Sequence, residues 1–235
     1  MNSILLLISL FLVIVAFVRA VSKHRARKSS SPPRKKSPER AGRVPSGSTP
    51  KERGRQGEAA VNSILKDYCR RTGGQLLDNV ILNFAGGTTQ IDHILLTTTG
   101  VLVIETKNYS GWIFAGTEDA EWTQVAGKAK YMFQNPLRQN YKHWLAVQDL
   151  LTFLPQEFIQ DVVVFAGTAE FKTSIPEGVL FLEELEEFLE RVNFGRISAS
   201  SLSRAVAHLE SARLEQNEET DRNHIEFLEK TFGRR

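Results

Sequence analysis

The sequence predicts an α/β protein in which helices flank a mixed central sheet, and three observations support this fold class. Residues 54–71 carry apolar side chains at helical spacing. Residues 76–115 contain short strand-like runs separated by glycine turns. Residues 161–166 ("DVVVFA") form the unbroken apolar run that is typical of a strand buried on both faces. A helix, antiparallel strands, a second helix and a central strand, in that order, describe a compact α/β core.

Each element has its own boundary signals. The first helix, over residues 54–71, is ended by the pair Gly73-Gly74, and the pair Asn135-Pro136 opens a second helix. Strands are expected over residues 76–82, 89–97, 101–106, 111–115, 161–166 and 179–182. Further helices are expected in a C-terminal helical extension (residues 176–235), over residues 181–192, 201–214 and 223–232.

The first 21 residues are expected to form a transmembrane anchor, with residues 3–21 in contact with lipid. Residues 3–18 contain no charge, proline or glycine, and the apolar stretch approaches the length that crosses a hydrocarbon core. Basic residues follow this stretch and none precedes it, which favours a retained single-pass span over the alternative, a cleaved signal peptide. By the positive-inside rule the N-terminus lies outside and the folded body lies in the cytoplasm, at the inner (cytoplasmic) membrane.

Residues 22–53 are expected to be a basic, disordered linker, because they are rich in Ser, Pro, Lys and Arg and nearly free of apolar side chains. Residues 19–55 hold 13 Lys and Arg against 2 acidic residues, whereas residues 56–235 hold 17 basic and 25 acidic residues. We favour a linker that lies near anionic lipid head groups. Nucleic-acid binding by the same charges is the alternative.

The composition limits the classes of site that the chain can build. At 235 residues and 41% hydrophobic content, the chain can bury one good core and still carry appendages. Its single cysteine, Cys69, excludes an intrachain disulfide and any zinc site made of several cysteines. Nothing in the composition therefore requires an oxidising compartment.

Three charged residues interrupt two predicted strands whose other residues are mainly apolar and are expected to be buried. Asp92 lies among isoleucines and leucines, and Glu105 and Lys107 follow the apolar run of residues 101–104. Residues two apart on a strand share a face, so Glu105 and Lys107 project together, and a turn at residues 99–100 can bring Asp92 near them. Converging carboxylates repel unless a divalent cation joins them, and hard oxygen ligands select Mg²⁺ or Mn²⁺. The alternative is a strand-edge ion pair with Asp92 capping a turn.

Taken together, three stretches resemble the nuclease-related domain (NERD) family within the PD-(D/E)xK nuclease superfamily. They are "GRQGE" (54–58), "QIDHILLTTTGVLVIETKNYSGWI" (90–113) and "NPLRQNYKH" (135–143), with the strand "VVVF" (162–165) behind them. The resemblance covers residues 52–168, about half the chain, and its middle stretch is the most specific. It implies a restriction-endonuclease-like core, here placed in a nuclease domain over residues 54–175. The motif PD-(D/E)xK has a proline before its first aspartate, whereas this sequence has Ile91 before Asp92.

The resemblance also implies a role for each position. Asp92, Glu105 and the carbonyl of Thr106 would be metal ligands, and Lys107 would be the catalytic lysine. Glu58 would reach the metal from the first helix through water, and Gln139 would position water or phosphate from the later helix. Behind these residues the supporting candidates are Gln90, His93 and Asn108.

Two functions of different class follow from this pattern. The first is a membrane-anchored nuclease that needs Mg²⁺ or Mn²⁺ and hydrolyses phosphodiester bonds of DNA, with RNA as the alternative substrate. The second is a catalytically silent module of the same fold that binds nucleic acid or a protein partner at the inner membrane. Trp112, Trp122 and Trp144 could stack on bases but are expected in the core. His143 is expected at the surface or behind the ligands rather than as a general base.

Overall fold

The computed structural model describes residues 49–215 together with Arg222 and Glu226. The expected anchor (1–21), nearly all of the expected linker (22–53) and nearly all of the expected last helix (223–232) lie outside the described residues. Within the described part of the chain, no helix is long and apolar enough to cross a membrane. The helices are α2 (Pro50–Thr72), α3 (Pro136–Leu150), α4 (Leu182–Arg191), α5 (Ala199–Ala212) and the short 3₁₀ helix η1 (Gln156–Phe158).

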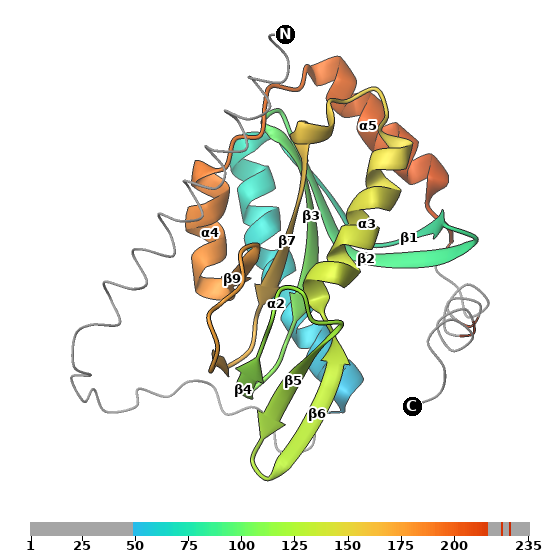
Figure 1. Ribbon diagram of the computed structural model, residues 1–235. Coiled ribbons are helices and arrows are strands. Elements are labelled where there is room, and N and C mark those ends of the chain that lie inside the picture. Colours follow the sequence, from blue (N-terminus) through green and yellow to red (C-terminus); the bar gives the residue numbers. More distant parts are fainter. Residues whose placement is uncertain (1–48, 216–221, 223–225, 227–235) are drawn as a thin grey trace, which may run out of the picture. The chain divides into compact units, whose positions relative to one another are not determined.

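The main sheet is mixed, as expected, and has the strand order β1-β2-β3-β7-β9 (Figure 1). Antiparallel pairing joins β1 to β2 and β2 to β3, and parallel pairing joins β3 to β7 and β7 to β9. Strand β3 is therefore central and consists almost wholly of buried residues. The strands of this sheet are β1 (Gln75–Phe84), β2 (Gly87–Thr97), β3 (Gly100–Lys107), β7 (Ile159–Phe165) and β9 (Val179–Phe181).

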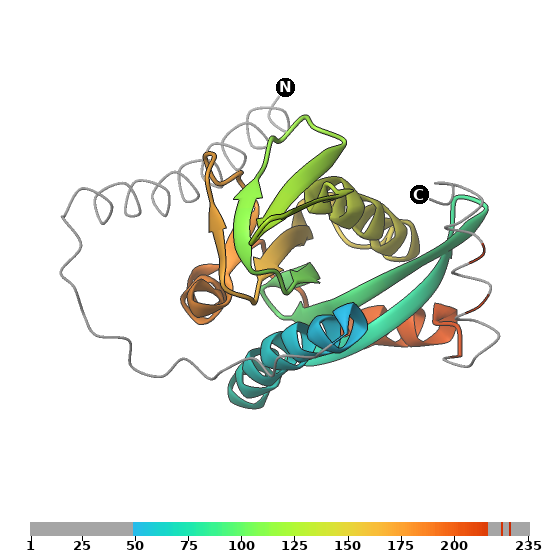
Figure 2. The ribbon, with the colours of Figure 1, turned by 90° about the horizontal axis from the view of Figure 1, so that it is seen from below.

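Helices cover both faces of the main sheet, so the expected α/β architecture is confirmed (Figures 1 and 2). On one face, Val61 and Leu65 of α2 and Leu185 and Leu189 of α4 pack against β3 and β7. The other core cluster receives its helical side chains from α3 and α5, namely Trp144, Ala146, Val147, Ala205 and Leu209. The helices after residue 176 thus complete the same core that the earlier elements begin.

A second, four-stranded sheet with the order β6-β5-β4-β8 was largely missed by the sequence analysis. Only β4 (Gly111–Phe114) was expected; β5 (Glu121–Ala126), β6 (Ala129–Gln134) and β8 (Ala169–Phe171) were not. Polar and apolar residues mix in β5 and β6 because only one face of this sheet packs on the core, through side chains such as Ile113, Trp122 and Phe133. The apolar run that indicates a strand is therefore absent from both.

Helix α2 begins four residues earlier than expected, inside the segment assigned to the linker. The N–H of Glu52 donates to Oγ1 of Thr49 (3.2 Å), and the N–H of Thr49 donates to Oε2 of Glu52 (2.6 Å). This capping box, with Pro50 in the first turn, satisfies N–H groups that a helix start otherwise leaves open. The helix therefore starts at Pro50 rather than at residue 54.

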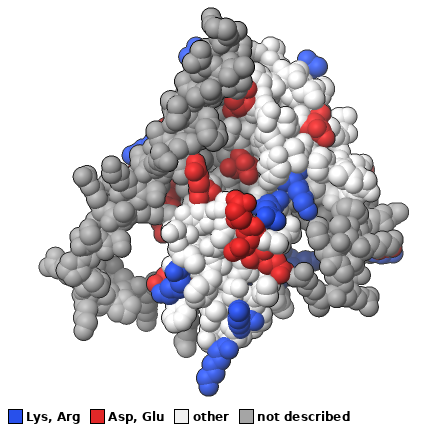
Figure 3. Space-filling model, viewed as in Figure 1, with Lys and Arg blue, Asp and Glu red and all other residues white. Residues whose placement is uncertain are grey.

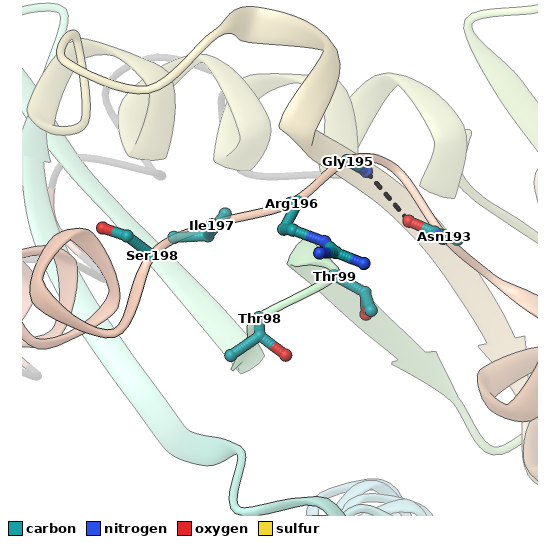
Figure 4. A pocket seen from close by; sticks show the side chains of 7 residues that line it. All are labelled: Thr98, Thr99, Asn193, Gly195, Arg196, Ile197 and Ser198. Carbon is teal, nitrogen blue, oxygen red and sulfur yellow. Dashed lines mark hydrogen bonds between the residues drawn. The ribbon is translucent and has the colours of Figure 1, made fainter.

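The segment after α4 docks on the turn between β2 and β3. The N–H of Phe194 donates to the carbonyl of Thr99 (2.9 Å), and the N–H of Ile197 donates to the carbonyl of Thr98 (2.8 Å). An open pocket of about 670 Å³ lies here, lined by Thr98, Thr99, Asn193, Gly195, Arg196, Ile197 and Ser198 (Figure 4). It lies at the start of β3, whereas Glu105 and Lys107 lie at the end of that strand.

Candidate functional site

The end of β3 carries a buried cluster of charged and polar side chains. The ammonium of Lys107 lies 2.5 Å from Oε1 of Glu105 and donates a second hydrogen bond, of 3.0 Å, to Oε1 of Gln139. The Glu105 residue is 2% exposed, so its charge is almost wholly removed from water. Glu105 and Lys107 share one face of β3, as their spacing of two predicts, and Gln139 reaches them from α3.

Asp92 joins this cluster at the point where β2 separates from β3. Pairing of the two strands runs from the turn only as far as His93 opposite Ile104. Beyond that point, Oδ2 of Asp92 accepts a hydrogen bond from the N–H of Thr106 (2.7 Å) and so replaces a backbone partner. The Lys107 carbonyl bonds toward β7, so by strand alternation the Thr106 carbonyl faces the same side as Asp92.

The two carboxylates of the cluster have opposite pKa shifts. Burial raises the pKa of Asp92 well above its usual value, and the nearby charge of Glu105 raises it further. Burial alone would also raise the pKa of Glu105, but the Lys107 ammonium and the hydrogen bond from His143 outweigh it, so this pKa is lowered. Without a cation, the site therefore favours an ionised Glu105 beside a protonated Asp92.

Lys107 stays charged in this environment. Burial lowers the pKa of a lysine, but the adjacent carboxylate of Glu105 and its hydrogen bond dominate, so the pKa of Lys107 is raised. A lysine of this kind donates hydrogen bonds and stabilises negative charge; it cannot serve as a proton acceptor near neutral pH.

Helix α2 brings Glu58 to the site through a close approach at Gly57. A Cβ on Gly57 would lie 2.6 Å from Cβ of Asn108, so only glycine allows the helix to sit this near the end of β3. The side chain of Asn108 secures the contact by donating to the carbonyl of Arg53 (2.7 Å). Burial raises the pKa of Glu58, and the charge of Glu105 raises it further.

His93 supports Glu58 from β2. Burial lowers the pKa of His93 to about 4, so the ring is neutral at ordinary pH, and a hydrogen bond to the backbone of Glu58 opposes this shift. The residue is 1% exposed. Its Nδ1 is buried and has no hydrogen-bond partner among the described residues.

The start of α3 is fixed by Asn135, and this fixes Gln139 one turn later. The Asn135 side chain accepts from the N–H of Leu137 (2.9 Å) and donates to the carbonyls of Thr117 (3.1 Å) and Asp119 (2.8 Å). Pro136 follows at the first helical position. The helix start is thereby tied to the loop before β5, and Gln139 faces Lys107.

His143 lies behind Glu105, the second of the two places that its sequence position allowed, but its direct bond to the carboxylate was not predicted. Its Nε2 lies 3.2 Å from Oε2 of Glu105, and its Nδ1 lies 2.7 Å from Oγ1 of Thr89. The residue is 4% exposed, so it belongs behind the ligands and not at the surface. One signal was available, because His143 follows Gln139 by four residues and must share its face of α3.

Other candidates do not reach the cluster. The side chain of Gln90, expected behind the ligands, instead donates to Oδ1 of Asn79 (2.5 Å) on the neighbouring strand. Trp122 and Trp144 are buried in the core, as expected, whereas Trp112 is 49% exposed on β4. The structure thus brings together Asp92, Glu105, Thr106, Lys107, Gln139 and His143. Glu58 lies on the adjoining helix α2, which His93 and Asn108 support.

The donor set of this cluster suits a hard cation with several water ligands. Among the described residues, no three His, Cys, Asp or Glu side chains converge closely enough to hold a metal ion by themselves. The available donors are Asp92, Glu105 and the carbonyl of Thr106, all oxygen atoms. Mg²⁺ and Mn²⁺ accept such partial sets because they keep waters in the remaining positions, whereas a structural zinc site needs four protein ligands.

Comparison with known proteins agrees with the geometry. Residues 53–166 match the nuclease-related domain, and this match contains Glu58, the charged end of β3 and the start of α3. An uncharacterized protein of Bacillus anthracis is 30% identical over 195 residues, which cover 79% of this chain and 88% of the relative. The similarity therefore extends well beyond the matched domain. The chain belongs to the nuclease-related domain (NERD) family.

Proposed function

We propose that the protein is a nuclease that hydrolyses phosphodiester bonds with the help of Mg²⁺ or Mn²⁺. The observation that carries this proposal is the buried cluster at the end of β3, where Lys107 contacts both Glu105 and Gln139 beside the carboxyl of Asp92. Burial of two carboxylates and a lysine costs several kcal/mol unless these groups form ion pairs with one another or bind a ligand. Such clusters are typical of functional sites.

Asp92, Glu105 and the Thr106 carbonyl would hold the cation, and Glu58 would act through water. When bound, the cation would polarise the phosphate and the attacking water. Lys107, because its pKa is raised, would donate hydrogen bonds to the water or a phosphate oxygen and stabilise the charge that develops there. Gln139 would orient the ammonium, since its Oε1 accepts one of the three N–H donors.

The charge distribution indicates how a nucleic acid would be held. On the face shown in Figure 3, basic side chains lie scattered among acidic ones and form no continuous stripe. On this face the cation at the site would be the main contact for phosphates, and the 13 Lys and Arg of residues 19–55 would add to it if they bind nucleic acid rather than lipid. We propose DNA as the preferred substrate, with RNA as the alternative, and attachment to the inner membrane through residues 3–21.

The proposal is tested by incubating the full-length chain with labelled single-stranded and duplex DNA and RNA. We expect cleavage in Mn²⁺ or Mg²⁺, none in EDTA, and none by Glu105→Gln under any condition. Lys130→Ala, an exposed lysine on β6, is the matched control and should cleave as the wild type does. If all substrates stay intact with every cation, the second function, a silent binding module, replaces the first.

A further inference from the structure

His143 is bonded at both ring nitrogens inside the protein. Nε2 faces Oε2 of Glu105 at 3.2 Å, and Nδ1 faces Oγ1 of Thr89 at 2.7 Å. His143 is 4% exposed and Thr89 is 9% exposed, so water does not compete freely for these bonds. A chain of hydrogen bonds therefore links β2, α3 and the carboxylate at the end of β3.

These hydrogen bonds determine which nitrogen of the His143 ring carries the proton. An ionised carboxylate only accepts hydrogen bonds, so Nε2 of His143 must be the donor toward Glu105. In the neutral ring Nδ1 is then an acceptor, and the hydroxyl of Thr89 donates to it. The Thr89 hydroxyl thus favours the tautomer of His143 with its proton on Nε2, which donates to Glu105.

The two oxygens of Glu105 consequently have separate partners. Oε2 is held by His143, whereas Oε1 faces Lys107 at 2.5 Å. If Glu105 binds a cation while His143 stays in place, it can offer Oε1 alone. Mg²⁺ and Mn²⁺ accept one oxygen per carboxylate in an octahedral shell, whereas Ca²⁺ takes 6–8 oxygen ligands and often both oxygens of one carboxylate.

We propose that His143, fixed by Thr89, is a positioning residue that reserves one oxygen of Glu105 and thereby favours Mg²⁺ and Mn²⁺ over Ca²⁺ at this site. The inference rests on the proposed metal-dependent function and adds the basis of cation choice. A purely structural histidine would satisfy Thr89 and Glu105 equally well but would have no influence on which cation binds.

The first test measures the binding of Mg²⁺ and Ca²⁺ to the full-length chain by calorimetry. In His143→Ala, Glu105 is free to rotate, so we expect the affinity for Ca²⁺ relative to Mg²⁺ to rise by about 10-fold or more. His143→Gln keeps an N–H donor on a side chain of similar reach and should restore most of the preference. His208→Ala, an exposed histidine of α5, is the control, and circular dichroism verifies that each variant is folded.

An unchanged ratio of Ca²⁺ to Mg²⁺ affinity in His143→Ala would overturn the inference. If the wild type binds neither cation, the proposed function itself fails, and the loss is seen before any variant is compared. These two failures are therefore distinct.

The second test needs neither a cation nor turnover. In ¹⁵N spectra of the histidine rings of the metal-free protein, His143 should show a protonated Nε2 and an acceptor Nδ1. Thr89→Val removes the hydroxyl at nearly constant volume, so we expect the Nδ1 signal to shift; Thr123→Val on β5 should leave it unchanged. A wild-type His143 protonated at Nδ1 alone would overturn the inference, because Nε2 could not then donate to Glu105.

Discussion

Glu105 carries a negative charge in a place where burial alone would neutralise it. Lys107 and His143 keep it ionised, whereas Asp92, which accepts only the N–H of Thr106 among the bonds described above, is driven toward its protonated form. The metal-free site thus disfavours the ionised form of Asp92 and holds an ion pair between Glu105 and Lys107. A divalent cation would favour the ionised form of Asp92, so the affinity for the cation should rise with pH.

Asp92→Asn tests this arrangement at the level of one residue. The amide oxygen still accepts from the N–H of Thr106, while an uncharged side chain replaces a carboxyl that burial makes costly to ionise. We expect the melting temperature of the metal-free protein at neutral pH to rise and the stabilisation by Mn²⁺ to vanish. Asp149→Asn, an exposed position on α3, should change neither. An equal Mn²⁺ shift in wild type and Asp92→Asn would remove Asp92 from any cation site.

The helices place the site by close contacts with strand ends. Helix α2 approaches Asn108 at Gly57, α3 is tied to the loop before β5 at Asn135, and the shared face of α3 carries Gln139 and His143. At two of these contacts, Gly57 and Asn135 have a role that is geometric rather than chemical. Substitutions at these positions should therefore displace the side chains of the site although they replace none of them.

Gly57→Ala is the sharpest change of this kind. Its Cβ would lie 2.6 Å from Cβ of Asn108, so α2 must move outward and carry Glu58 with it, at a cost of about 1–3 kcal/mol in unfolding free energy. Gly54→Ala, in the same helix, meets nothing nearer than Oε1 of Glu58 at 3.7 Å and should gain up to about 1 kcal/mol from helix propensity. Urea unfolding measures both. Equal effects of the two substitutions would contradict the described packing of α2.

Strand β7 carries a half-buried carboxyl, that of Asp161, which makes stability depend on pH. Burial raises the pKa of Asp161 from 3.8 to about 6, so the folded state holds a proton that the unfolded chain releases at lower pH. Its stabilising contribution is complete below pH 4 and is lost as the pH rises toward 6. At pH 7 the ionised group therefore costs on the order of 3 kcal/mol at most.

Asp161→Asn should accordingly raise the unfolding free energy at pH 7 and leave it nearly unchanged at pH 4. Urea unfolding from pH 4 to pH 7 measures this difference, with Asp67→Asn on the exposed side of α2 as the control. If Asp161→Asn were destabilising at pH 7, the carboxylate would be making a contact that offsets its burial.

At the scale of the whole molecule, the sequence predicted the main sheet well and the second sheet poorly. The strand β7 was recognisable because both of its faces are buried, which produces the unbroken run "VVVF". The hairpin of β5 and β6 has only one packed face, and its mixed pattern resembles a loop. The helices after residue 176 were expected as an extension, but their packing against α2 and α3 depends on contacts between segments far apart in sequence.

The candidate site was predictable where spacing along one element decides which side chains meet. Glu105 and Lys107 followed from the period of a strand, and Asp92 followed from the turn that pairs its strand with theirs. The resemblance to the family supplied Glu58 and Gln139. The pairing of His143 with Glu105 crosses from α3 to β3, and that of Gln90 with Asn79 crosses between strands. Neither partner choice is encoded in local spacing, so both required the structure.

The expected anchor makes a prediction for the full chain in cells. Residues 3–18 are uncharged and the basic flank lies on one side, so deletion of residues 1–21 should move the protein from the membrane fraction to the soluble fraction. Fractionation followed by immunoblotting measures this. Full-length protein in the soluble fraction, or a mature chain that lacks its first residues, would contradict the anchor.

The most direct test of the proposed chemistry separates cation binding from turnover. Lys107 is not a ligand, and its ammonium contacts the oxygen of Glu105 that a cation would need. We therefore expect Lys107→Ala to bind Mn²⁺ at least as tightly as the wild type while losing cleavage by roughly 100-fold or more, and Glu105→Gln to lose both. Calorimetry and single-turnover cleavage by the same preparations measure the two properties. Cleavage by Lys107→Ala at the wild-type rate would contradict a catalytic role for this lysine.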